Sequence, residues 1–149
     1  MTGVDELYQN LILHHGRSPR NFGTLAEPDR AAHGHNPLCG DRIHLTLALD
    51  GERIAEVRFT GDGCAIATAS SSVMTDAIKG RTLEEAKALF AAFHALVAGE
   101  EPAPGPSLDP KLAAFAGVRR FPIRVKCAML AWRTLEAALA NGREAVTTE

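Results

Sequence analysis

Three cysteines and one aspartate are the residues of this sequence best suited to metal or thiol chemistry. Cys39 and Asp41 flank Gly40, which permits a sharp backbone turn that lets both side chains converge on one ion. Three cysteines is an odd number in a chain of 149 residues. That number argues against a disulfide framework and for thiols that stay reduced in the cytosol.

The other two cysteines are expected near helix starts. Cys64 immediately precedes a helix predicted over 65–79, where unpaired backbone N–H groups favour a thiolate. Cys127 follows Arg124 and Lys126 near the predicted start of the final helix, so cations and a helix terminus support its thiolate as well. Both thiols are therefore candidate metal ligands or nucleophiles.

Cys39, Asp41, Cys64 and Cys127 together form a plausible tetrahedral ligand set. Three thiolates favour zinc or an iron-sulfur centre over hard cations, and the carboxylate adds a weaker oxygen ligand. Such a mixed set suits an exchangeable site better than a purely structural one.

Spacing alone leaves other interpretations open. A lone cysteine is more often an inert core residue than a ligand, and no pair here has the C-x2-C spacing of many zinc sites. Asp41 after a glycine is equally suited to capping a turn. The residues by themselves support both metal binding and inert burial.

Among the cations, Arg124 is the candidate functional residue, whereas Arg119 and Arg120 are interpreted as a solvated basic patch. His33 and His35 precede the first cysteine on a polar segment and are conceivable spare ligands, but exposed imidazoles are the simpler interpretation. His94 is expected near the surface of a helix, and the Met129 and Trp132 stripe is expected in the core.

Composition excludes several classes of protein. The chain has 16 Lys plus Arg against 18 Asp plus Glu, a net charge of −2, so no basic field attracts nucleic acid. No apolar run reaches the roughly 20 residues that cross a bilayer, and the acidic N-terminus lacks a signal peptide's basic region. We expect one domain over 1–149, located in the cytoplasm, with no membrane partner.

The predicted elements place these residues at junctions. Apolar residues alternate on both sides of Asp50 and Gly51, which predicts a β-hairpin, and Thr82 with Glu85 forms a capping box. The segment 22–42 is interpreted as a long loop with at most one short strand. The predicted elements are an amphipathic helix over 4–15, strands over 43–49 and 54–60, helices over 65–79 and 82–99, a connector over 100–107, a short helical turn over 110–115 and a final helix over 125–139. This order predicts an α+β fold, a small antiparallel β-sheet packed against several helices.

Three segments identify the family that the chain resembles. Asn-Pro-Leu-Cys-Gly-Asp at 36–41, Gly-Asp-Gly-Cys-Ala-Ile at 61–66 and Arg-Val-Lys-Cys-Ala at 124–128 resemble the three motifs of the IscU/SufU/NifU N-terminal family. Ser-Pro-Arg-Asn at 18–21, the insert around 90–100 and Ala-Trp at 131–132 are similar to its SufU branch. The resemblance implies the SufE/NifU-like architecture.

The resemblance also implies a function in iron-sulfur cluster assembly. On that basis Cys39, Asp41, Cys64 and Cys127 bind zinc, and the chain is a zinc-dependent sulfurtransferase that accepts persulfide sulfur from a cysteine desulfurase of the SufS type. Cys39 is the implied acceptor, freed when a desulfurase histidine displaces it from zinc, and Arg124 assists docking or steadies the freed thiolate.

Two alternatives remain. The chain resembles scaffolds that assemble a transient [2Fe-2S] cluster on the same four ligands and pass it to apo-acceptor proteins, a role without enzymatic activity. The second alternative is a structural zinc module that presents an interaction surface. IscU scaffolds carry a histidine before the last cysteine and a Leu-Pro-Pro-Val-Lys chaperone segment, whereas Lys126 and Phe-Pro-Ile-Arg-Val-Lys stand here. We expect a monomer or a weak homodimer.

Overall fold

The computed structural model describes residues 3–37, 40–99, 110–140 and 145–147. Its core element is a β-sheet whose strands follow the order β3-β2-β1-β4. The first three strands are antiparallel neighbours, and β4 pairs in parallel with β1 at the edge. The strands are β1 (Arg30–Asn36), β2 (Asp41–Asp50), β3 (Arg53–Asp62) and β4 (Ala145–Thr147).

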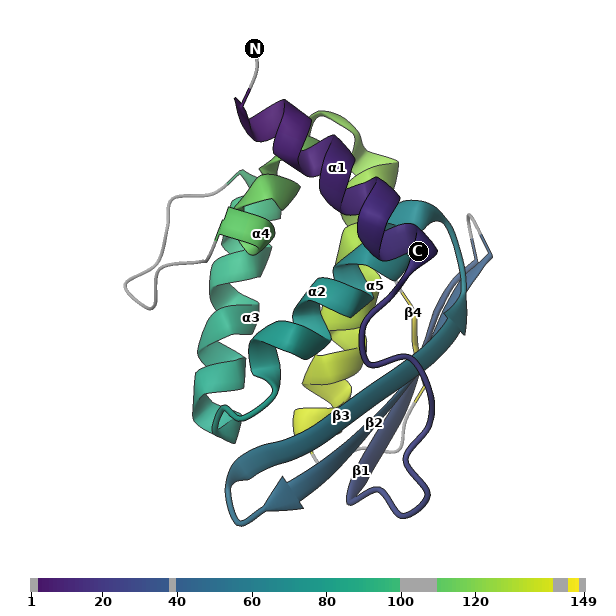
Figure 1. The fold of residues 1–149 in the computed structure, drawn as a ribbon, viewed down its shortest axis with the longest axis vertical. Helices are drawn as coiled ribbons and strands as arrows, with labels where there is room; N and C mark the ends of the chain where they lie inside the picture. The colour runs from purple at the N-terminus through teal and green to yellow at the C-terminus, as the bar shows by residue number, and fades with distance from the viewer. Residues whose placement is uncertain (1–2, 38–39, 100–109, 141–144, 148–149) are drawn as a thin grey trace.

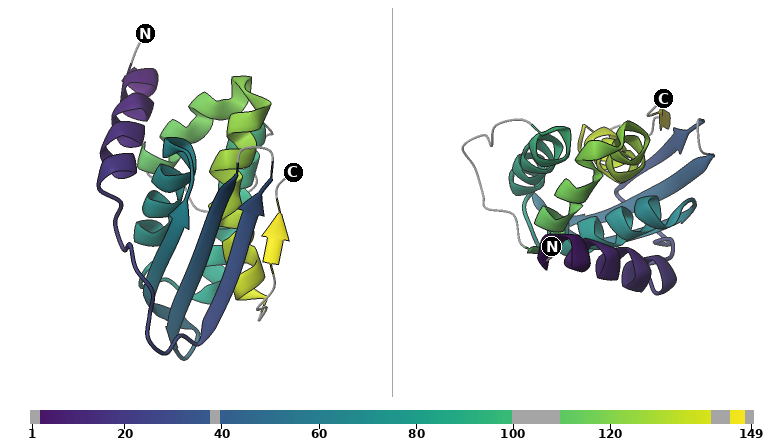
Figure 2. Two further views of the ribbon diagram at one scale, coloured as in Figure 1. Left: turned by 90° about the vertical axis from the view of Figure 1, so that its right-hand side faces the viewer. Right: turned by 90° about the horizontal axis from the view of Figure 1, so that it is seen from above.

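The helices cover one face of this sheet, as Figures 1 and 2 show from three directions. α5 packs on β1 and β2, α2 packs on β3 and α5, and α1 lies across α2. This arrangement confirms the predicted α+β fold. The helices are α1 (Gly3–Arg17), α2 (Ala65–Ile78), α3 (Leu83–Ala98), α4 (Pro110–Ala113), the 3-10 helix η1 (Ala114–Arg120) and α5 (Pro122–Leu139). None of these helices is long and apolar enough to span a membrane.

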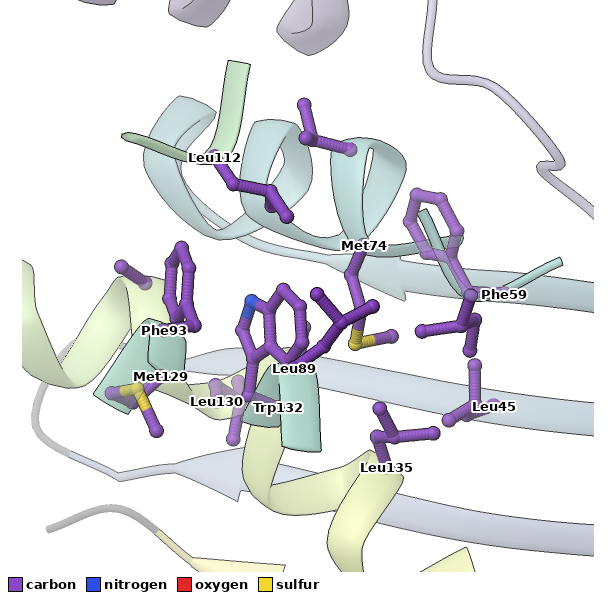
Figure 3. Close-up of a cluster of buried hydrophobic side chains, with 14 of the residues drawn as sticks. Leu45, Phe59, Met74, Leu89, Phe93, Leu112, Met129, Leu130, Trp132 and Leu135 are labelled. Carbon is purple, nitrogen blue, oxygen red and sulfur yellow. The ribbon is translucent and has the colours of Figure 1, made fainter. Parts of the chain in front are cut away.

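The hydrophobic core lies between the sheet and the helices (Figure 3). Trp132 of α5 is fully buried and stacks on Phe93 of α3, with ring centroids 4.5 Å apart. Phe115 of η1 contacts Phe93 edge to face and is also fully buried. Burial of such aromatic side chains stabilises the fold by about 2 to 3 kcal/mol each. The predicted core role of Met129 and Trp132 is confirmed.

Local signals explain the best-predicted elements. The hairpin turns at Gly51, whose φ of +65° favours glycine. Thr82 and Glu85 form both hydrogen bonds of a capping box at the start of α3. The helix ends at Gly99 in the left-handed conformation, as expected.

Other boundaries differ from the prediction. The segment read as a long loop contains β1, because Ala32, Gly34 and Asn36 alternate inward and gain a sheet partner in β2. The final helix begins at Pro122, three residues early, since proline suits the first helical position. The β4 strand was not predicted, because a three-residue strand leaves no periodic pattern.

A buried polar contact fixes α1 against α2. His15 is 2% exposed, and its Nδ1 lies 2.7 Å from the hydroxyl of Ser72. The same hydroxyl accepts the backbone N–H of Arg20. Burial is the main cause that lowers the pKa of His15, and the charges of His14, Lys111 and Arg20 lower it further. The imidazole is therefore neutral in the fold at neutral pH.

This neutral imidazole predicts a pH-dependent stability. The unfolded chain binds a proton at His15 at a higher pH than the folded chain, so stability is full above the unfolded pKa and falls as the pH drops below it. Urea unfolding of chelator-treated protein at about pH 7.5 and about pH 5.5 measures this slope. The slope should become shallower in His15→Gln and remain in the control His94→Gln, which changes a half-buried histidine of α3. An unchanged slope in His15→Gln would contradict the assignment.

Candidate metal centre

Asp41, Cys64 and Cys127 converge from three elements, although 86 residues separate the first from the last (127 − 41). One ligand atom from each, a carboxylate oxygen and two sulfurs, all lie within 4.8 Å of one another. Strand β2 supplies the aspartate, the start of α2 supplies Cys64, and α5 supplies Cys127. Three such atoms this close together are a candidate ligand set for one metal ion.

Asp41 is the most constrained of the three. It is the first residue of β2 and is 1% exposed. Its Oδ1 accepts the backbone N–H of Cys64 at 2.8 Å, and its Oδ2 lies 3.5 Å from the Cys64 sulfur. Within the described part of the chain the carboxylate forms no salt bridge. A buried carboxylate with no cation partner is suited to a metal ion.

Gly63 makes the approach of Asp41 possible. A Cβ atom at Gly63 would lie 2.9 Å from Asp41 Oδ1 and 3.1 Å from its Cγ, which is closer than such atoms pack. The loop between β3 and α2 therefore needs glycine beside the carboxylate. In the sequence, Gly63 is visible only as the second glycine of the Gly-Asp-Gly-Cys segment. Its contact with Asp41 appears only in the folded structure.

Cys64 is the N-cap residue of α2, as predicted. Its backbone is extended, with φ −68° and ψ 165°, and its sulfur accepts the N–H of Ala67 at 3.4 Å. That N–H and the positive end of the helix dipole face the sulfur. The residue is half-buried, whereas Asp41 and Cys127 are buried.

Cys127 is 4% exposed and is the sixth residue of α5. The prediction that it benefits from a helix start is therefore wrong, because α5 begins at Pro122 and the terminal effect fades beyond the first turn. Its position on the buried side of α5 instead directs the sulfur toward Asp41 and Cys64.

Cys39, the fourth predicted ligand, lies outside the described residues. Its neighbour Gly40 has φ +77°, and no atom lies within 4 Å of the Cβ that another residue would add. The N–H of Gly40 donates to the carbonyl of Asn36 at 2.8 Å, which closes the turn before Asp41. Gly40 thus adopts the turn conformation that the sequence predicted.

An open hollow of about 500 Å³ adjoins Cys64. Its walls are mainly apolar and come from α1, the start of α2 and Arg124 of α5. The Arg124 guanidinium lies 4.3 Å above the ring of Phe121 and is exposed. The residues lining the hollow are Tyr8, Gln9, Ile12, Leu13, Cys64, Ala65, Ile66 and Arg124.

Tyr8 is a site residue that sequence reasoning missed. The predicted amphipathic helix over 4–15 includes Tyr8 without singling it out. Burial raises the pKa of Tyr8, the adjacent Arg124 charge lowers it, and the Cys64 and Cys127 thiols raise it again. Tyr8 thus lies within electrostatic range of the cysteines, which no one-dimensional pattern could indicate.

His33 and His35, interpreted from the sequence as exposed imidazoles, are not part of the cluster. His33 and His35 lie on β1, not on a loop, and alternate with residues that face the core. His33 stacks on His44 of β2, with ring centroids 4.2 Å apart. Burial is the main cause that lowers the pKa of His44, and His33 lowers it further. These imidazoles occupy the sheet face that points away from the core.

Two other predictions on polar residues have mixed outcomes. His94 is half-buried and stacks on Phe90, which confirms its boundary position on α3. Arg120 is exposed, as expected. Arg119 is also exposed, but its Nε donates to the carbonyl of Leu96 in the last turn of α3. It therefore stabilises a helix end in addition to contacting solvent.

The donor set fits a thiophilic metal. Two sulfurs and one carboxylate oxygen surround a common point, and a fourth ligand would complete tetrahedral coordination. Hard cations such as magnesium prefer six oxygen ligands, which this cluster lacks among the described residues. Zinc or an iron-sulfur centre suits these atoms best.

Comparison with known proteins supports the same interpretation. A family model described as "NifU-like N terminal domain" matches residues 7–124. This range includes Cys39, Asp41 and Cys64, and Cys127 lies just beyond it.

Several relatives extend over almost the whole chain. The zinc-dependent sulfurtransferase SufU of Bacillus subtilis (strain 168) is 41% identical over 138 residues, covering 93% of this chain and 92% of the relative. The iron-sulfur cluster assembly scaffold protein IscU of Streptococcus pyogenes serotype M1 is 40% identical over 145 residues, covering 97% and 90%. A crystal structure of FiSufU from Fervidobacterium islandicum AW-1, a candidate iron-sulfur cluster assembly scaffold for the SUF system, superposes with a TM-score of 0.80 at 34% identity, covering 92% and 99%.

Removal of the carboxylate should weaken metal binding. We expect Asp41→Ala to lower zinc affinity by at least about tenfold, because a buried ligand is lost and nothing nearby replaces it. Competition with a chromophoric chelator measures the change. Asp62→Ala is the matched control, since Asp62 is an exposed acid on the same hairpin. Equal affinities for Asp41→Ala and the unmodified chain would rule out this carboxylate as a ligand.

A single methyl group at Gly63 should have a similar but smaller effect. The added Cβ pushes the Asp41 carboxylate away from the cluster, so zinc affinity should fall in Gly63→Ala. Gly16→Ala, which meets only ordinary van der Waals contact, should leave the affinity unchanged. If Gly63→Ala bound zinc as tightly as Gly16→Ala, the close approach of Gly63 to Asp41 would not constrain the site.

Proposed function

The chain belongs to the family of NifU-like N-terminal domains, and from this we propose that it is a zinc-dependent sulfurtransferase of iron-sulfur cluster assembly. Its sulfur donor is the persulfide of a cysteine desulfurase of the SufS type. We further propose that residues 1–149 act as one cytoplasmic domain, as a monomer or weak homodimer.

The observation that carries this proposal is the convergence of Asp41, Cys64 and Cys127 at one point. An oxygen and two sulfurs from distant parts of the chain meet where α2 begins, beside an open hollow. We assign Cys39 as the fourth ligand, since it lies two residues before Asp41 and is the remaining cysteine of the sequence.

Zinc, when bound, would keep its ligand thiols deprotonated at neutral pH and hold them at fixed positions. Hydrogen bonds within the protein keep the ligands aligned. Asp41 is the weakest ligand of the set, and its bond to the Cys64 N–H keeps it aligned when the fourth ligand leaves. The site can therefore release one thiolate without losing its shape.

Cys39 is the proposed acceptor. Its thiolate attacks the outer sulfur of the partner's persulfide, and a new sulfur-sulfur bond forms as the partner's sulfur-sulfur bond breaks. The partner's cysteine leaves as a thiolate, and the transferred sulfur keeps its proton. The step exchanges one sulfur-sulfur bond for another, so it needs no external oxidant or reductant.

Arg124 is proposed to assist this exchange. Its exposed guanidinium borders the hollow beside Cys64 and lies over Phe121. A cation there steadies the thiolate that is released. It can also pair with an acidic group of the partner.

A second candidate function is a scaffold for a [2Fe-2S] cluster. The 40% identity to a relative named as an IscU scaffold favours it, and the same ligands suit iron. Lys126 precedes Cys127 here, where the scaffolds that this sequence resembles have a histidine, so one of their potential metal ligands is missing. We therefore place sulfur transfer first.

The test is a titration of the purified chain into a cysteine desulfurase assay, together with elemental analysis. We expect near-stoichiometric zinc and strong stimulation that Cys39→Ala abolishes, because the acceptor thiol is lost. Mass spectrometry of the chain should detect one added sulfur atom in the unmodified protein and none in the variant. Asp62→Ala, an exposed change on the same hairpin, should behave as unmodified protein.

Two outcomes would redirect the proposal. Full stimulation by Cys39→Ala would rule out Cys39 as the acceptor. Bound iron and labile sulfide with little stimulation, followed by cluster transfer to an apo-ferredoxin after anaerobic reconstitution, would favour the scaffold.

A further inference from the structure

The hydroxyl of Tyr8 is buried, and no hydrogen-bond acceptor contacts it among the described residues. Its ring is held firmly on two sides. Phe115 contacts it edge to face with ring centroids 6.2 Å apart, and a Cβ at Gly117 would lie 3.1 Å from its Cγ. Phenylalanine would fill this place equally well, so packing does not account for the hydroxyl.

Tyr8 lies on the wall of two hollows, one of which adjoins the metal centre. Tyr8 lines the hollow that contains Cys64 and also a second hollow of about 360 Å³ that contains Arg120 and Phe121. Arg124 lines both hollows. The electrostatic influence of Cys64, Cys127 and Arg124 on Tyr8 agrees with this location.

Arg124 cannot satisfy the hydroxyl proton. A guanidinium has donors and no acceptor, so at most it donates to the tyrosine oxygen. The proton of Tyr8 still requires an acceptor, and a buried donor without one is costly. In the hollow beside Tyr8, the only side-chain acceptors of the described residues are Gln9 and Cys64. Gln9 is an exposed residue of α1, whereas Cys64 is half-buried, which favours the sulfur as the acceptor.

Metal loading changes the acceptor strength of this sulfur. In the described structure Cys64 lies 3.5 Å from Asp41 Oδ2, a contact that uses the thiol proton. With a metal bound, the Cys64 sulfur would be a thiolate and a stronger hydrogen-bond acceptor than the thiol. The N–H of Ala67 already donates to it from α2.

We propose that Tyr8 is a positioning residue of the metal centre whose hydroxyl donates a hydrogen bond to the Cys64 thiolate when metal is bound. This inference rests on the metal centre of the proposed function, but not on sulfur transfer. Ala67 and Tyr8 then donate to the sulfur from α2 and α1, and the pair orients Cys64 toward the metal.

Tyr8→Phe tests the proposal, because it removes only the oxygen and keeps the ring between Phe115 and Gly117. We expect its zinc dissociation constant, measured by chelator competition, to rise about tenfold. The metal-free variant should unfold at the same urea concentration as the unmodified chain or a higher one, since its unpaired hydroxyl is gone. Gln9→Ala is the matched control and should leave zinc affinity unchanged.

Cobalt substitution provides a spectroscopic readout. Loss of a hydrogen bond to the thiolate raises the energy of its lone pairs, so the sulfur-to-cobalt charge-transfer band should move to longer wavelength in Tyr8→Phe and stay in place in Gln9→Ala. A purely structural tyrosine would leave this band unshifted.

The opposite results would overturn the proposal. If Tyr8→Phe binds zinc as tightly as the unmodified chain, the hydroxyl does not contact the centre. If its metal-free form is less stable, the hydroxyl has a structural partner instead. If the unmodified chain fails to bind zinc, the metal centre itself is wrong, and this inference falls with it.

Discussion

The hydrogen bond from the backbone N–H of Cys64 to Asp41 Oδ1 is the constraint on which the candidate centre depends. It ties the beginning of β2 to the beginning of α2 and fixes a buried carboxylate beside a sulfur. Gly63 must lack a side chain for this contact to form. The sheet and the helices therefore meet at a position set by one polar contact, and the metal ligands lie around it.

The rest of the fold places Cys127 and the open hollow next to this hydrogen bond. The packing of Trp132 and Phe93 fixes α5 in the core and so places Cys127 beside Asp41. The His15 and Ser72 contact holds α1 against α2. Through α1 the hollow and Tyr8 are placed next to Cys64. Core packing thus positions Cys127, and the polar contact between α1 and α2 positions Tyr8 and the hollow beside Cys64.

Sequence reasoning was most successful where local chemistry decides the structure. The hairpin turn at Gly51, the capping box at Thr82 and the helix start at Cys64 each depend on neighbouring residues, and all three were predicted. Strand β1 and the partners of Gly63 and Tyr8 depend on contacts with distant segments, which no local pattern contains. In the sequence, Asp41 is equally suited to capping a turn and to binding a metal. Its burial beside the two cysteines favours metal binding.

X-ray absorption at the zinc edge of the loaded protein tests the central claim most directly, because it reports the atoms bound to the metal. Coordination by Asp41, Cys64, Cys127 and the proposed Cys39 predicts three sulfurs at about 2.3 Å and one oxygen at about 2.0 Å. Asp41→Ala should remove the short-distance carboxylate oxygen and leave the sulfurs. A first shell with fewer than two sulfurs, or one dominated by imidazole scattering, would contradict the account.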